Sequence, residues 1–216
     1  MPRRRSVPDD GAHADLLRLA RELNLTALPE TLPEIFRAAE TEGCSYTEFA
    51  LRMLRAEREA RRTRRMGRNL KRARLGVVEG LDGFDFSIRP QLEARVVREL
   101  ANCRWVEERR NIICVGPPGT GKTRVIKALC REATLKDYRV LYVHTAEMLA
   151  ELHASLADGT FQKALRRYVK PDVLALEELG YQDIDGRQVN DLFRVVAARH
   201  RTAATLVAAN TGFKQW

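Results

Sequence analysis

The chain has 216 residues, a net charge of +9 and 44% hydrophobic residues, which is ordinary for a globular protein with a packed core. No apolar run approaches the roughly 18 residues that span a bilayer, and no apolar stretch follows the N-terminal arginines, so we expect neither a membrane protein nor a secreted one. The four cysteines lack the spacing of a zinc site or a disulfide framework, and a cytoplasmic protein is therefore expected.

The first third of the chain predicts a small helical domain. Residues 1–12 carry no apolar period and are expected to be disordered. Residues 13–75 are expected to form short helices, separated by Pro29 and Pro33, and then one long helix. We interpret this region as a domain that binds DNA or a partner.

The long helix is expected to begin at the capping box Ser45-Tyr-Thr-Glu48, whose side chains can satisfy exposed backbone N–H groups. Between Arg52 and Arg74 stand eleven Lys or Arg residues and two acids, which accounts for the whole net charge of the chain. Gly76 is expected to end the helix, and residues 76–90 are expected to form a linker.

Residues 91–216 predict an α/β domain. Leu92, Val96 and Leu100 mark a helix, after which short apolar runs alternate with helical patterns. This alternation predicts a parallel sheet with helices on both faces. The expected strands are 111–115, 139–143, 172–176 and 205–209. One helix is expected to begin at Lys122, and three more are expected near 146–156, 160–169 and 187–200.

A phosphate-binding loop follows the first expected strand and opens the next helix. It matches G-x-x-x-x-G-K-[ST] in full, and its glycines let backbone N–H groups face phosphates. Lys122 would neutralise the β- and γ-phosphates, and the Thr123 hydroxyl would bind Mg²⁺. A chance match in a Gly/Pro turn is the alternative, which the strand and helix on either side disfavour. The loop predicts ATP and Mg²⁺ as cofactors, held by Gly116, Pro117, Pro118, Gly119, Thr120, Gly121, Lys122 and Thr123.

Two acids end the third expected strand. In phosphoryl-transfer proteins, such a position carries a carboxylate on the magnesium side and another that polarises water. We assign Glu177 to the metal and Glu178 to the attacking water, with two solvated acids at a strand end as the alternative. Asn210 ends the fourth strand, where it could reach the γ-phosphate, although an asparagine there is also an ordinary turn residue.

A basic stripe runs along the long helix. Arg61, Arg65, Arg68 and Arg72 recur at intervals of three and four residues, so they share one helical face. Such a face suits the phosphate backbone of duplex DNA without implying that bases are read. The alternative is a solvated helix surface.

These motifs together resemble the IstB-like transposition helper ATPases, relatives of DnaC-type helicase loaders within the AAA+ class. The phosphate-binding loop is general to many families, whereas the Glu-Leu-Gly-Tyr run is more specific. The resemblance covers nearly the whole chain and is carried by Lys71-Arg-Ala-Arg-Leu75, Phe84-Asp-Phe86, Arg104-Trp-Val-Glu107, the loop 116–123, Tyr138-Arg-Val-Leu-Tyr142, Asp158-Gly159, Glu178-Leu-Gly-Tyr181, Ala209-Asn-Thr-Gly-Phe213 and Trp216.

The resemblance implies a P-loop NTPase core of the AAA+ type behind a small helical domain. It also implies ATP-dependent self-association on duplex DNA, delivery of a transposase of the same element, and a role for Asn210 as the sensor of the γ-phosphate. Family members usually carry aspartate where Glu177 stands. They also continue beyond Trp216 with a fifth strand beside strand 111–115 and an arginine that reaches a neighbouring nucleotide. We therefore expect a C-terminally truncated core that hydrolyses ATP poorly or not at all.

Two other functions are also compatible with the sequence. One is a DnaC-like helicase loader in DNA replication, whose main target is a protein. The other is a remnant that binds nucleotide or DNA without hydrolysis. The concentration of charge in the arginine stripe favours the DNA-binding helper for transposition over the loader. Only a measurement of ATP hydrolysis separates the helper from the remnant.

Overall fold

The computed structural model describes residues 10–78, 80–81, 84–87, 92–180 and 185–210, which fall into two compact units. We call Met1–Arg65 the helical unit and Met66–Trp216 the sheet unit. The boundary between the two units lies inside a helix and comes earlier in the chain than the domain boundary expected at residue 75. Residues 10–12, expected to be disordered, are helical, and the rest of the expected tail lies outside the described residues. Residues 79, 82–83 and 88–90 of the expected linker 76–90 also lie outside the described residues.

The helical unit contains α1 (Asp10–Glu22), α2 (Leu28–Glu42) and the first part of α3 (Tyr46–Ala73). Its small core is built from Ala20, Leu28 and Leu32. The expectation that Pro33 separates helices was wrong, because Pro33 lies inside α2 next to the fully buried Leu32. The capping role of Ser45 is present, since its hydroxyl accepts a hydrogen bond from the Glu48 N–H at 3.2 Å.

The sheet unit is built on four parallel strands in the order β1-β4-β3-β2. The apolar runs of the sequence place each strand to within a few residues, and β3 extends far enough to include both acids. The strands are β1 (Ile112–Val115), β2 (Val140–His144), β3 (Val173–Leu179) and β4 (Ala204–Ala209). The helices are α4 (Ala94–Leu100), α5 (Arg104–Glu107), α6 (Lys122–Leu135), α7 (Thr145–Ala157), α8 (Phe161–Val169) and α9 (Gly186–Arg199).

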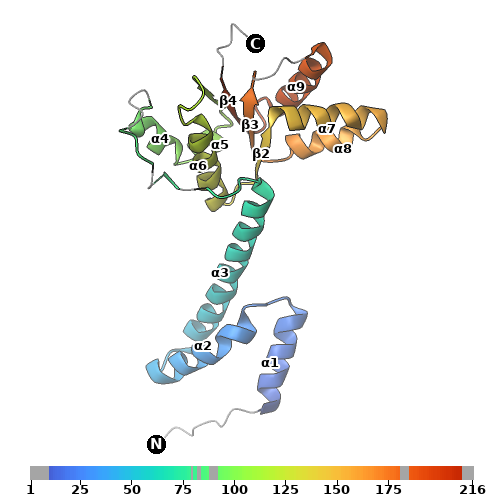
Figure 1. Ribbon diagram of the computed structural model, residues 1–216. Helices are drawn as coiled ribbons and strands as arrows, with labels where there is room; N and C mark the ends of the chain where they lie inside the picture. The colour runs from blue at the N-terminus through green and yellow to red at the C-terminus, as the bar shows by residue number, and fades with distance from the viewer. Residues whose placement is uncertain (1–9, 79, 82–83, 88–91, 181–184, 211–216) are drawn as a thin grey trace, which may run out of the picture. The chain divides into compact units, whose positions relative to one another are not determined.

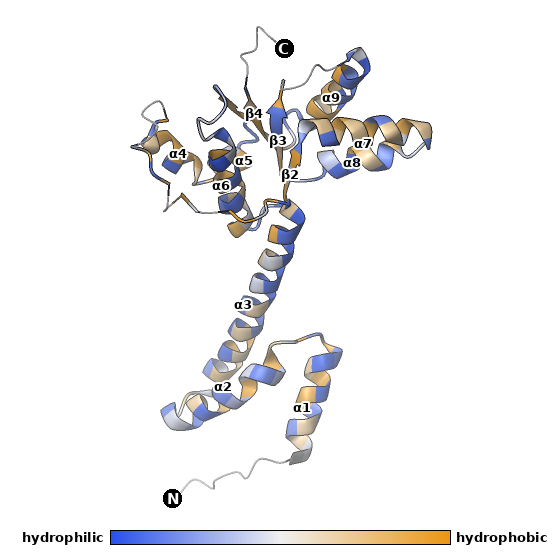
Figure 2. Ribbon diagram, in the orientation of Figure 1, coloured by the Kyte–Doolittle hydropathy of each residue, from blue (hydrophilic) through white to orange (hydrophobic). Residues whose placement is uncertain are grey.

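Helices cover both faces of this sheet, with α4–α6 on one side and α7–α9 on the other (Figure 1). Alternating strand residues belong to two separate cores, because successive side chains of a strand point to opposite faces. Val140 and Tyr142 of β2 pack with α6, whereas Leu141 and Val143 pack with α7 and α8. The strands are accordingly hydrophobic along most of their length (Figure 2). No helix in the described part of the chain combines the length and apolar character needed to cross a membrane.

Candidate functional site

The loop between β1 and α6 has the backbone that its glycines predict. Gly119 and Gly121 adopt φ values of +79° and +90°, a left-handed region in which other residues are strained. Gly121 is also the residue from which α6 begins, so the first N–H groups of the helix point into the loop. The Gly116 N–H donates to Ala209 O at 3.2 Å, which ties the loop to the end of β4. The loop is thus a concave array of backbone donors suited to phosphate.

Lys122 is folded over this loop. Its ammonium donates to the carbonyls of Gly116 and Pro117 at 2.7 and 2.8 Å. Within the part of the chain that the structure describes, Lys122 forms no ion pair with a carboxylate. Its positive charge is therefore positioned beside the loop and uncompensated, which suits an anionic ligand.

Thr123 and Glu177 meet across α6 and β3. The Thr123 hydroxyl donates to Oε1 of Glu177, whose residue is 3% exposed. The other carboxylate oxygen, Oε2, is buried and has no hydrogen-bond partner among the described residues. An orphaned buried carboxylate oxygen beside a hydroxyl is a donor set that fits Mg²⁺, which prefers oxygen ligands. Burial, together with the charge of Glu177, raises the pKa of the neighbouring Tyr142 well above its usual value.

Glu178 is brought beside Glu177 by an irregularity in β3. The pairing of β3 with β4 shifts register between Leu176 and Leu179, and Glu178 adopts φ +59°. In a regular strand, neighbouring residues face opposite sides of the sheet, so this bulge allows both acids to line one cavity. The Glu178 carboxylate is half-exposed, and its Oε2 lies 3.4 Å from Nδ1 of His144. Glu178 is therefore accessible to water, whereas Glu177 is not.

One cavity of about 790 Å³ joins most of the predicted site residues. Pro118, Gly119, Gly121, Lys122, Thr123, Glu177, Glu178 and Asn210 all line it. Gly116, Pro117 and Thr120 instead line a neighbouring groove along β1 and α4.

Sequence reasoning missed four residues that line the same cavity, namely Val77, Val78, Arg124 and Lys127. The side chain of Lys127 lies over the ring of Tyr142, with Nζ 4.9 Å from the centroid. Arg124 and Lys127 follow the loop by one and four residues, so helical spacing could have indicated them. Val77 and Val78 reach the cavity only through the fold, and no local pattern marks them.

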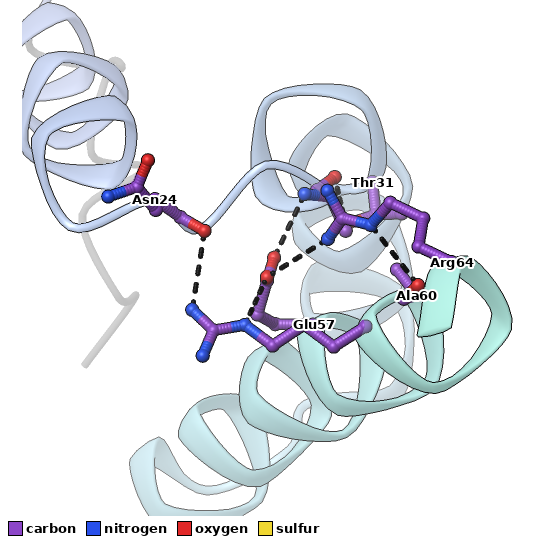
Figure 3. A network of polar contacts seen from close by, with 7 residues as sticks. Asn24, Thr31, Glu57, Ala60 and Arg64 are labelled. Atoms are coloured by element: carbon purple, nitrogen blue, oxygen red, sulfur yellow. Dashed lines mark hydrogen bonds and ion pairs between the residues drawn. The ribbon is translucent and has the colours of Figure 1, made fainter. Parts of the chain in front are cut away.

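The predicted arginine stripe has more than one environment. Arg61 donates from Nε to Oε1 of Glu57 at 2.8 Å and from Nη2 to the Asn24 carbonyl at 3.2 Å. Arg64 and the Ala27 N–H also bind this carboxylate, so a polar network holds α3 to the turn before α2 (Figure 3). Arg61 therefore has a structural partner within the helical unit. Arg65, Arg68 and Arg72 are exposed on α3.

Comparison with known proteins identifies the family. The family model for IstB-like ATP binding protein matches residues 18–216. The insertion sequence IS5376 putative ATP-binding protein of Geobacillus stearothermophilus is 31% identical over 194 residues, which cover 90% of this chain and 77% of that protein. The insertion sequence IS21 putative ATP-binding protein of Pseudomonas aeruginosa is 32% identical over 198 residues, covering 92% and 75%.

Solved structures show the same fold. The DnaC helicase loader superposes with a TM-score of 0.53 and 20% identity, over 67% of this chain and 80% of that one. AMPPCP-bound DnaA from Aquifex aeolicus superposes with a TM-score of 0.54 and 22% identity, over 61% of this chain and 42% of DnaA. These structural neighbours support the AAA+ fold, whereas the sequence matches identify the family. The chain belongs to the family of IstB-like ATP-binding proteins.

Proposed function

We propose that this protein is an ATP-dependent, DNA-binding helper for transposition, which assembles on duplex DNA and recruits the transposase of its element. The observation that carries the proposal is the single cavity in which the phosphate-binding loop, the two acids of β3 and Asn210 converge. The relatives named as insertion-sequence ATP-binding proteins support the link to transposition.

In the proposed mechanism, the backbone N–H groups of the loop and the ammonium of Lys122 hold the phosphates of ATP. Thr123 and Glu177 would hold Mg²⁺, which when bound would supply positive charge to stabilise the phosphates. Glu178, with its half-exposed carboxylate, would orient and deprotonate the attacking water. Asn210, at the end of β4, would contact the γ-phosphate and distinguish ATP from ADP.

The DNA contact is proposed for the exposed arginines of α3. Arg65, Arg68 and Arg72 present guanidinium groups that can neutralise phosphates without reading bases. A helicase loader would instead depend on a protein target, and the likeness to DnaC at 20% identity supports the fold alone. The charge of α3 therefore favours DNA over a protein as the first partner.

The test is binding of the full chain to plain duplex DNA, with ATP, with ADP and without nucleotide. We expect ATP to promote assembly on the DNA, seen as a rise in scattering or in sedimenting complexes. Lys122→Ala should lose the effect of ATP. Lys136→Ala, at the exposed end of the same helix, should keep it. Absence of duplex binding by the parent chain, with nucleotide binding intact, would favour a loader acting on a protein.

Recruitment is tested on the same DNA immobilised on beads. The transposase of the same element should be retained only when ATP and this protein are both present. Retention that does not depend on this protein would refute the helper role while leaving ATP binding in place.

A further inference from the structure

A second cavity of about 1080 Å³ lies in the sheet unit. Val140 and Leu141 at the start of β2 and Pro171 ahead of β3 help to line it, so it lies at the amino ends of the strands. The nucleotide-side cavity lies at the opposite edge, where the carboxyl ends of the strands bring Glu177 and Asn210 together. The two cavities share no lining residue, so this second one is a separate surface.

Uncompensated cations line this cavity, which we call the basic groove. Lys71 and Arg72 come from the last turn of α3, and Lys163, Arg166 and Lys170 come from α8 and the residue that follows it. All five are exposed, and their side chains form no hydrogen bond or ion pair within the described part of the chain. No Asp or Glu is among the residues that line the groove.

Three further arginines of the basic groove are already neutralised. Each is bound to an acid that lies outside the lining, so these three carboxylates are engaged with other arginines and not with the five free cations. These ion pairs also fix the end of α3, the start of β2 and α8 in place. The pairs are Arg74 with Glu147, Arg139 with Asp172 and Arg167 with Glu151, at 3.0, 2.7 and 2.5 Å.

We infer that the basic groove binds the sugar–phosphate backbone of duplex DNA, an inference that rests on the proposed DNA-binding function. Like charges gathered around a concave surface repel one another, and an anionic polymer relieves this repulsion. Lys163, Arg166 and Lys170 are spaced by three and four residues, so they form a row along one face of α8. The groove presents neither acids nor aromatic rings, which suits phosphate contact and not base recognition.

The groove also extends the arginine stripe. Arg72 belongs to both surfaces, and Arg68 lies one helical turn before it on α3 within the same unit. A DNA backbone bound at Arg68 and Arg72 would therefore continue into the groove within the sheet unit. This arrangement places DNA contacts and the nucleotide cavity in one compact unit.

The test uses the full chain with Lys163→Gln, Arg166→Gln and Lys170→Gln combined. Binding to plain duplex DNA is measured over a range of salt concentrations. Each neutralised phosphate contributes about 0.9 to the slope of log affinity against log salt, so the triple variant should lose about two to three units of slope. Binding of fluorescent ATP should stay unchanged, which reports that the sheet unit is still folded.

The matched control carries Arg95→Gln, Arg104→Gln and Arg187→Gln, which remove the same charge from exposed sites outside the groove. Its salt slope should equal that of the parent. An unchanged slope in the groove variant, or equal losses in both variants, would overturn the groove while the proposed function stands. Failure of the parent chain itself to bind duplex DNA would overturn both.

Discussion

Arg61 donates from Nε to Oε1 of Glu57 at 2.8 Å, and this ion pair joins an exposed guanidinium to a carboxylate of a residue that is only 4% exposed. Losing the arginine would leave the buried charge with fewer partners. We expect Arg61→Gln to lower the free energy of unfolding by about 1.5–3 kcal/mol, the range for hydrogen bonds to charged groups. Arg58→Gln, at an exposed neighbour on α3, should change it by less than about 0.5 kcal/mol. Equal effects in denaturant unfolding would contradict the structural role of Arg61.

The same carboxylate predicts an acid-sensitive contribution to stability. Burial opposes ionisation of Glu57, but the hydrogen bonds from Arg61 and the Ala27 N–H and the charge of Arg64 outweigh it, so the pKa lies below the usual 4.5. A carboxyl whose pKa is lowered by folding stabilises the folded state above its unfolded pKa, and this contribution is lost as the pH falls through the folded value. The stability difference between the parent and Glu57→Gln should therefore be constant above about pH 4.5 and shrink below it. A difference that is independent of pH down to 3 would contradict the assignment.

The pair of Thr123 and Glu177 predicts a magnesium-specific effect. Glu177→Ala removes the buried carboxylate that accepts the Thr123 hydrogen bond, while the loop N–H groups and Lys122 stay in place. We expect ATP affinity with Mg²⁺ to fall about tenfold or more, equivalent to about 1.4 kcal/mol. Affinity in excess chelator should change little. Fluorescent ATP titrations with and without Mg²⁺ separate the two effects, and an equal loss in both conditions would show that Glu177 has no role at the metal.

Hydrolysis should be slow in the parent chain and should depend on both acids of β3. Glu177 is one methylene longer than aspartate, and angstrom-scale misplacement of a catalytic group can cost about a hundredfold in rate. We expect phosphate release well below about 1 s⁻¹ with DNA present and faster release by Glu177→Asp. Glu178→Gln should abolish release without weakening ATP binding, since only the base is lost. Brisk turnover by the parent, or full activity of Glu178→Gln, would contradict these roles.

Arg199 should be a major determinant of the stability of the sheet unit. It is 1% exposed, and its guanidinium donates to the carbonyls of Tyr168, Val169, Pro171 and Ala204. Burial lowers the pKa of this guanidinium to about 10. Arg199→Met would leave several buried carbonyls without donors, at about 1–3 kcal/mol each, and should cost about 3–5 kcal/mol in unfolding free energy.

The matched control for this change is Arg187→Met, which alters an exposed arginine on the same helix. Thermal and denaturant unfolding should show little effect there. A stable Arg199→Met protein would mean that water or a rearranged backbone satisfies the carbonyls.

The sequence was sufficient for the features whose causes are local. The glycines of the loop, the apolar runs of the strands and the capping Ser45 each act within a few residues, and their positions were predicted closely. The burial of Leu32 was not foreseeable, and it outweighs the helix-breaking tendency of Pro33. The family assignment and the parallel fold are confirmed by the comparisons.

Features formed by segments that are far apart in the chain could not be predicted from the sequence. Val77 and Val78 approach the nucleotide cavity because the chain returns past the loop after α3. The basic groove joins Arg72 to Lys163, which are far apart in the chain, and neither α8 nor the end of α3 marks it alone. Arg61 was assigned to DNA from its helical spacing, and its bond to Glu57 became visible only in the fold. Its DNA contact stays a prediction.

Glu178 combines a proposed catalytic role with a left-handed backbone conformation, and random mutagenesis at this position would separate the two effects. Asparagine and glycine adopt positive φ readily, whereas valine, isoleucine and threonine are strained there. Inactive alleles at this position should therefore divide into two phenotypes. Variants with Asn or Gly would be well expressed and would still bind ATP. Variants with a β-branched residue would give little folded protein. The φ angle of Glu177 is not positive, so the effect of a replacement there would depend on burial and charge and not on backbone conformation.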